Sequence, residues 1–303
     1  MSNGGALQEL KKISIGKNLK IRPLYVSAAR NVTTKFMGEY PSVFKGTGIE
    51  FADYRQYSPS DDASKIDWLH SLKANKLLVR EYVEERNLTI MFLVNTSNSM
   101  LLGSQEKLKH EYAAELVSSM AMGALTASDA VGLCMASNRI REFIAPSLGL
   151  KQCKNMMRAL VDARNYGGHG LYGAQLGKVS AMMTRNSLIF LVSDFINNDK
   201  GWKKNLAVAA RKHQVIAIIV RDPIDNELPA SGHIMLQDPF SGEQMLVDTK
   251  KIRKRYNEEA KRDLDEVKAT FTRHGVTFIE LATDKDFAAP IWGMLRRRKK
   301  SWS

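Results

Sequence analysis

The sequence lacks the features that build secreted or membrane-spanning proteins. Only two of its 303 residues are cysteines, Cys134 and Cys153. They are too few for a disulfide framework, and they have no partners spaced for a zinc site. No apolar run approaches the ~18–20 residues that a transmembrane helix needs, and residues 1–15 mix charged with apolar side chains, unlike a signal peptide. We therefore expect a soluble, cytoplasmic protein.

Signature motifs of nucleotide and acyl chemistry are also lacking. The sequence has no G-x-x-x-x-G-K-[ST] loop for hydrolysing ATP and no G-x-S-x-G nucleophile elbow. Residues 168–173 (GHGLYG) satisfy G-x-G-x-x-G, but a dinucleotide site needs a strand before them, and Met156–Ala163 predicts a helix. A cryptic hydrolase built from Ser99, His169 and Asp194 stays open as one alternative.

Positive charge is in clear excess. The chain has 45 Lys and Arg against 32 Asp and Glu, a net charge of +13, which favours anionic partners. The excess is concentrated in Lys250–Arg255 and Arg296–Lys300, and acidic residues follow the first run as on a solvated helix face. Neither run is interleaved with aromatic residues that could stack on bases. A basic nucleic-acid-binding protein is therefore the alternative function, not the leading one.

From Leu88 onward, apolar strands alternate with amphipathic helices. The predicted strands are Leu88–Asn95, Ala130–Met135, Glu142–Ala145, Ser187–Phe195, Gln214–Val220 and Val276–Leu281. The predicted helices are Gln105–Ser128, Leu150–Ala163, Tyr172–Thr184, Trp202–Lys212, Lys250–His274 and Phe287–Arg298. This alternation predicts an α/β fold, a doubly wound, mostly parallel sheet with helices on both faces. A β-hairpin inserted around Pro239–Gly242 interrupts the rhythm.

Residues 1–87 differ from residues 88–303, so we predict two parts. The first part has short helices near Ala6–Lys12 and Asp62–Leu72 and a strand at Leu77–Val83. Its pattern is too irregular for a core of its own, and we expect it to lean on the sheet domain.

Polar residues follow two of the predicted strands where those strands end. Asn95, Ser97 and Ser99 follow the first strand, and Asp194 ends the strand Ser187–Phe195. A glycine-rich loop that contains His169 lies between them in the sequence. In a doubly wound sheet the carboxyl ends of the strands border the ligand crevice, where such oxygens would suit a hard divalent cation.

This arrangement resembles the von Willebrand factor type A fold and its metal-ion-dependent adhesion site. That site consists of Asp-x-Ser-x-Ser, a threonine on a second loop and an aspartate on a third. Ser97, Ser99 and Asp194 match it, whereas Asn95 stands in place of the first aspartate and His169 in place of the threonine. The resemblance therefore implies a degenerate adhesion site, with these five positions as the partner-binding residues.

The two departures argue against metal binding. At ~4 Å and an effective dielectric constant of ~20, one charge beside a divalent ion is worth up to ~8 kcal/mol before desolvation offsets most of it. Imidazole is also a poor ligand for magnesium. We expect no cofactor and no metal, and Mg²⁺ held by Ser97, Ser99 and Asp194 is the alternative.

The first part of the chain narrows the family. Its motifs G-x-G-x-E-F, R-x-Y, I-D-W and E-E-R resemble those of the domain of unknown function 58 family, in which they precede a von Willebrand type A domain. The resemblance continues through Arg221-Asp222-Pro223 and the hairpin, and it departs from the family at Ser60 and Leu72–Ala74. The motif residues are Glu50, Phe51, Arg55, Tyr57, Asp61, Asp62, Asp67, Trp68, Glu81 and Glu85.

We interpret these motif residues as structural. The charged ones could form a network that pins the first part to the sheet, with Phe51, Tyr57 and Trp68 filling the seam, and a partner-docking face is the alternative. The leading function is a non-enzymatic protein–protein interaction module without catalytic residues. The family resemblance implies an adaptor working with a MoxR-type AAA+ ATPase or its client.

Overall fold

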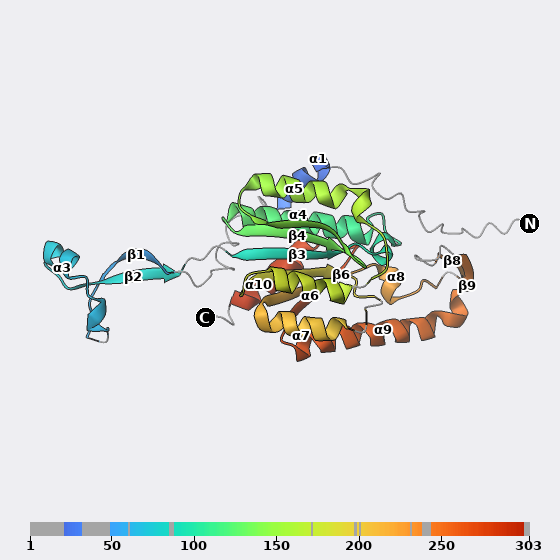
Figure 1. Ribbon diagram of the computed structural model, residues 1–303. Helices are drawn as coiled ribbons and strands as arrows, with labels where there is room; N and C mark the ends of the chain where they lie inside the picture. The colour runs from blue at the N-terminus through green and yellow to red at the C-terminus, as the bar shows by residue number, and fades with distance from the viewer. Residues whose placement is uncertain are drawn as a thin grey trace, which may run out of the picture.

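The computed structural model of the protein describes residues 21–31, 49–59, 61–84, 88–170, 172–196, 199, 201–230, 232–237 and 244–299. A six-stranded sheet forms the main body, with helices on both faces (Figure 1). Its strand order is β10 (Thr277–Ala282), β7 (Gln214–Arg221), β6 (Leu188–Ser193), β3 (Thr89–Asn95), β4 (Ala130–Ala136) and β5 (Ile140–Ser147). All neighbours are parallel except β5, which runs antiparallel to β4 at one edge.

Two apolar cores lie on opposite faces of this sheet. One contains side chains of α1 (Ile21–Asn31), α4 (Lys109–Thr126), α5 (Leu150–Val161) and α10 (Ala288–Lys299). The other contains side chains of α6 (Tyr172–Met182), α7 (Trp202–Lys212) and α9 (Thr249–Arg273). Since successive side chains of a strand point to opposite faces, Phe92 joins the first core and Met91 the second. Continuous apolar strands are therefore buried on both sides.

The predicted fold class is confirmed. Every strand and helix predicted for residues 88–303 has its counterpart, displaced by a few residues at the ends. The inserted hairpin is also present, because β8 (His233–Gln237) pairs antiparallel with β9 (Gln244–Asp248). Among the described residues, no helix combines the length and the apolar character needed to cross a membrane.

The helix α1 was not predicted from the sequence. Its sequence has only a thin apolar stripe, in which Leu24 and Ala28 are the buried positions. Contacts with α4 complete the docking: Asn31 Nδ2 donates to Ser119 Oγ at 3.0 Å, and Ser27 Oγ donates to Glu115. Tertiary packing rather than periodicity stabilises this helix. The helix predicted at Ala6–Lys12 lies outside the described residues.

A small lobe precedes the sheet domain and stands apart from it in Figure 1. It consists of an antiparallel pair, β1 (Ile49–Gln56) and β2 (Leu78–Glu84), with a 3₁₀ turn η2 (Ala63–Lys65) and helix α3 (Trp68–Ala74). The strand β1 was not predicted. The segment predicted as one helix over Asp62–Leu72 is divided in two, because Asp62 caps η2 and Asp67 caps α3.

The partners described for the lobe's motif residues belong to the lobe itself. Arg55 forms an ion pair with Asp61 at 2.7 Å, and the buried Asp67 accepts from Tyr54 Oη at 3.2 Å and from the backbone N–H of His70 at 3.2 Å. These contacts order the lobe, and the network predicted between the motif residues and the sheet stays a prediction. The side chains of Glu50, Phe51 and Glu81, and all of Glu85, lie outside the described residues.

Trp68 contradicts the prediction that it fills a seam. Its side chain is 62% exposed, and Leu69 and Leu72 are exposed beside it. Trp68 is the first residue of α3, directly after the capping Asp67, and this position places it on the outside of the turn. Tyr57 is half-buried, and its backbone N–H donates to Leu77 O at 2.9 Å.

Asp129 introduces a titratable group into the turn between α4 and β4. Its carboxylate accepts the backbone N–H of Leu88 at 2.7 Å, and the side chain is buried. Burial raises the pKa of Asp129 to about 6, although the hydrogen bond from Leu88 acts in the opposite direction. The folded protein therefore binds this proton more tightly than the unfolded chain does.

We predict that Asp129→Asn changes how stability depends on pH. As pH rises from ~4 to ~6, the natural protein gives up the Asp129 proton at a cost, so its free energy of unfolding falls relative to that of the neutral variant. Between pH 4 and pH 7 the free energy of unfolding of the natural protein should fall, relative to that of the variant, by on the order of 1–3 kcal/mol in total. Denaturant unfolding at several pH values measures this difference.

Asp162→Asn is the control, because the pKa of Asp162 is lowered to about 2, chiefly by its hydrogen bond from Arg164. Parallel pH curves for the Asp129 variant and the natural protein would contradict the prediction.

Candidate functional site

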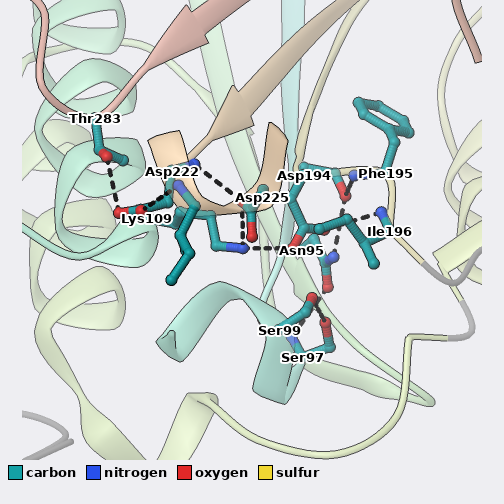
Figure 2. Close-up of polar contacts among 12 residues, drawn as sticks. Asn95, Ser97, Ser99, Lys109, Asp194, Phe195, Ile196, Asp222, Asp225 and Thr283 are labelled. Atoms are coloured by element: carbon teal, nitrogen blue, oxygen red, sulfur yellow. Dashed lines mark hydrogen bonds and ion pairs between the residues drawn. The ribbon is translucent and has the colours of Figure 1, made fainter. Parts of the chain in front are cut away.

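Four of the five predicted adhesion-site residues lie at the carboxyl edge of the sheet. Asn95 ends β3, Ser97 and Ser99 lie in the loop that forms the 3₁₀ turn η3 (Asn98–Leu101), and Asp194 directly follows β6. Because β3 and β6 are parallel neighbours, their ends meet, and Figure 2 shows Ser97 and Ser99 beneath Asp194. The convergence expected from the sequence is therefore observed.

Local hydrogen bonds fix the loop after β3. Asn95 Oδ1 accepts the backbone N–H of Ser97 at 2.9 Å, and Asn95 Nδ2 donates to Ser193 Oγ at 3.0 Å. The Ser97 and Ser99 hydroxyls share a hydrogen bond at 3.0 Å. An aspartate at position 95 could accept from Ser97 but could not donate to Ser193. The amide thus links the loop after β3 to the end of β6, which is what asparagine contributes here.

The fifth predicted residue, His169, lies elsewhere on this edge. Its side chain is exposed, whereas Asn95, Ser97, Ser99 and Asp194 are all buried. Its loop is held beside η3, because Asn98 N donates to Gly168 O at 3.0 Å and Gly168 N donates to Asn98 Oδ1 at 2.9 Å. Gly168 has a φ of 92°, and a Cβ there would meet Arg141 Nη2 and Asn138 Oδ1, each at 2.9 Å. Glycine is therefore required at this close approach.

Lys109, which was not predicted as a site residue, provides the central charge of the site. Its ammonium lies 3.1 Å from Asp194 Oδ2 and 2.8 Å from Asp225 Oδ2 (Figure 2). Lys109 is 1% exposed, and Asp225 lies in α8 (Pro223–Asn226), just beyond β7. The sequence held one signal that could have indicated it. The helix α4 is apolar over nearly its whole length, so a lysine in its first turn could be expected to lie away from water.

Opposing effects act on the proton of Lys109. Burial disfavours the ammonium, but the charges of Asp194 and Asp225 outweigh burial and raise its pKa. Burial also raises the pKa of Asp225, and the nearby Asp194 charge adds to that rise. Lys109 is the first residue of an 18-residue helix, where a positive charge opposes the helix dipole. The two carboxylates, not the helix, therefore stabilise the cation in this position.

Asp222 is a second buried carboxylate, next to this triad. It accepts from Ser104 Oγ at 2.5 Å, from Ser104 N at 2.9 Å and from Thr283 Oγ1 at 3.1 Å. It also caps α8 by accepting from Ile224 N at 3.1 Å. One fully buried side chain thus joins three connections: the loop before α4, the turn after β7 and the turn after β10. The Arg-Asp-Pro motif places it there, since it directly follows β7.

A divalent cation does not fit these residues as they stand. The Asp194 and Asp225 oxygens that face inward are bonded to Lys109, and Asp194 Oδ1 accepts Ile196 N at 3.3 Å. The hydroxyls of Ser97 and Ser99 are bonded to each other, and Asn95 supplies no charge. Among the described residues, no group of three or more His, Cys, Asp or Glu side chains is arranged for a metal ion.

The contacts also differ from those of a hydrolase or a dinucleotide site. Ser99 bonds to Ser97, and Asp194 bonds to Lys109 rather than to an imidazole. The predicted helix before the glycine loop is present as α5, followed by a 3₁₀ turn over Ala163–Asn165. A dinucleotide fingerprint requires a strand there.

Fold and site together define an α/β domain with a polar, ion-paired carboxyl edge. The chain belongs to the family described as "Protein of unknown function DUF58", whose family profile matches residues 53–266. This match includes most of the lobe as well as the sheet edge that carries Asn95, Asp194 and Asp225.

Relatives and solved structures extend this comparison. The chain is 24% identical over 284 residues to the uncharacterized protein Rv1480 of Mycobacterium tuberculosis, a match covering 92% of this chain and 89% of that protein. It is 30% identical over 118 residues to the uncharacterized protein MAV169 of Mycobacterium avium, covering 38% of this chain and 69% of that one. Structural similarity extends to BatB from Bacteroides thetaiotaomicron (TM-score 0.47, 13% identity, 70% of this chain and 99% of that chain). A von Willebrand factor type A protein from Catenulispora acidiphila is also similar (TM-score 0.39, 10% identity, 74% and 44%).

We predict that Asp222→Ala lowers the free energy of unfolding by roughly 1–3 kcal/mol or more, as expected when buried donors lose the acceptor that satisfied them. Ser104 and Thr283 would then lose their acceptor inside the protein. Equilibrium unfolding in urea measures the loss. Asp162→Ala is the matched control: Asp162 pairs with an Arg164 side chain that is 88% exposed, and such surface pairs contribute less than ~1 kcal/mol. Equal losses in the two variants would show that Asp222 does not join the three connections as described.

Proposed function

We propose that the protein is a non-enzymatic interaction module, an adaptor that binds a protein partner through the carboxyl edge of its sheet. The observation that carries this proposal is the state of the adhesion-site positions. Four of them are buried and engaged in hydrogen bonds or ion pairs within the chain: Asn95 donates to Ser193, Ser97 bonds to Ser99 and Asp194 bonds to Lys109. Such a set provides shape and rigidity rather than a nucleophile or a general base. The proposed partner is a MoxR-type AAA+ ATPase or its client, in the cytoplasm, and no cofactor takes part.

The partner would contact the loops that cover the buried residues. Asn138, Arg139 and His169 are exposed on this edge, and Asn98 and Arg141 are half-buried beside them. Arg141 Nη2 donates to Gly167 O at 3.0 Å, so the arginine connects the β4–β5 turn to the glycine loop. The edge therefore presents positive charge on an ordered backbone. Positive charge would speed the approach of an acidic partner surface.

We predict that this edge binds the ATPase without any divalent cation. The immobilised protein is first treated with a chelator and washed, and it is then used to pull down the purified ATPase. Recovery of the ATPase should equal that obtained with immobilised protein kept in excess Mg²⁺. The physical reason is that Lys109 already neutralises part of the buried negative charge. Loss of binding on chelation, in a binding assay in which the ATPase needs no nucleotide, would count against a metal-free contact.

We also predict that negative charge added to the edge weakens binding. The double variant Arg139→Glu/His169→Glu should lower affinity at least tenfold, mostly through slower association, because both side chains are exposed and the two new carboxylates would repel an acidic partner surface. Biosensor kinetics at two salt concentrations measure this effect. Arg211→Glu is the matched control, since Arg211 is an exposed arginine in the last turn of α7, at the opposite edge of the sheet. Equal weakening by the control would place the contact elsewhere.

A further inference from the structure

The buried charges at the carboxyl edge are balanced from within the chain. Asp194 is fully buried and the Asp225 side chain is 13% exposed, and both bond to the same ammonium. The donors to Asp222, next to them, are neutral within the described part of the chain: Ser104, Thr283 and the backbone. Two carboxylates brought this close together in a dry site need a cation between them. Lys109 is the cation that the structure supplies.

The direction from which Lys109 arrives is informative. It belongs to the first turn of α4, which begins eight residues after η3 ends at Leu101. The loop with Ser97 and Ser99 and the lysine therefore belong to one continuous segment. Its side chain reaches across to the end of β6 and to α8 beyond β7 (Figure 2). A lysine at a helix N-terminus opposes the dipole, so helix stability does not account for this residue. Charge balance at the strand ends does.

We infer that the Lys109 ammonium takes the place of a divalent cation at this edge, so that the protein carries its counter-cation as a residue of α4. Asn95 fits the same arrangement, because a singly charged ammonium needs less negative charge around it than a divalent metal does. The site is therefore a latent cation site, closed by a side chain. This inference uses the site geometry alone, and it rests on the proposed function only for one consequence, that partner binding has no divalent-cation switch.

The decisive experiment removes the ammonium and asks whether a metal replaces it. The variant Lys109→Ala leaves Asp194 and Asp225 facing the space that the side chain filled, with Ser97 and Ser99 below. We expect the natural protein to bind no Mn²⁺ in calorimetry and to unfold at the same temperature with Mn²⁺ as with a chelator. We expect Lys109→Ala to bind one Mn²⁺ with a Kd of roughly 0.1–1 mM or lower and to show a saturable rise in its unfolding temperature, as ligand binding to the folded state requires.

Two control variants separate this effect from general stabilisation by salt. Lys109→Ala/Asp194→Asn should lose the Mn²⁺ response, because the double variant lacks the carboxylate that the cation would share. Lys203→Ala removes a surface lysine that pairs with Glu266 at 2.5 Å, and it should gain no response. The inference is overturned if Lys109→Ala shows no response, or if the natural protein binds Mn²⁺ as tightly as the variant does. Neither outcome bears on whether the ATPase binds, which the pull-down measures separately.

If Lys109→Ala does not fold, the natural protein still tests the inference. In protein labelled with ¹⁵N-lysine, an ammonium held by two buried carboxylates exchanges slowly with water and gives its own resonance, which Lys109→Arg identifies by its loss. We expect this resonance to be present and unchanged by millimolar Mg²⁺. Its absence, or a saturable shift on adding Mg²⁺, would show that the ammonium does not hold this position, and would overturn the inference.

Discussion

A buried lysine shared by two carboxylates is the interaction on which the carboxyl edge of this protein depends. Lys109 links α4 to the end of β6 through Asp194 and to α8 through Asp225. Breaking such a pair by removing one partner leaves a buried charge uncompensated, at a cost of roughly 3–5 kcal/mol. The lysine therefore holds the ends of neighbouring elements in register. Asp222 does the same with neutral donors, and the two networks share the backbone turn after β7.

This arrangement changes what the edge can offer to a partner. In a metal-dependent adhesion site, the cation has a coordination position left for an acidic side chain of the ligand. Here the positive charge is fixed to the chain and lies beneath the surface, and the serines beside it bond to each other. Recognition on this edge would then depend on the covering loops, whose exposed groups include Asn138, Arg139 and His169. The buried network makes the loops rigid, and rigid loops lose less conformational entropy on binding.

The lobe shows a different use of charged motif residues. Arg55, Asp61 and Asp67 order a two-stranded sheet and a short helix that have little apolar core, since Ile66 and Val79 are the buried apolar side chains described there. Two strands alone are marginally stable in water, so these hydrogen bonds and the caps of η2 and α3 matter more than they would in a large domain. The same caps turn Trp68 outward. Three residues of the motif thus contribute to local order in the lobe.

The accuracy of prediction from the sequence followed the strength of the local signal. The strands β3, β6 and β7 are continuous apolar runs, and α5, α7 and α9 carry clear helical periodicity, so their existence and order followed from the residues. By contrast, α1 and β1 have weak patterns, and contacts with other segments stabilise them. The positions Asn95, Ser97, Ser99 and Asp194 followed from where strands end. His169 was correctly assigned to the glycine loop, but only the structure shows its side chain exposed to solvent.

The α/β class and the polar strand ends, with an amide at Asn95, could be predicted from the residues, because these features depend on residues that are near one another in the chain. The charge that balances Asp194 could be identified only in the folded structure. Lys109 is 85 residues from Asp194 and 116 from Asp225 in the sequence, and no periodicity or motif connects the three. Burial removes the water that would otherwise solvate the two carboxylates. In the folded chain the Lys109 ammonium therefore balances their charge.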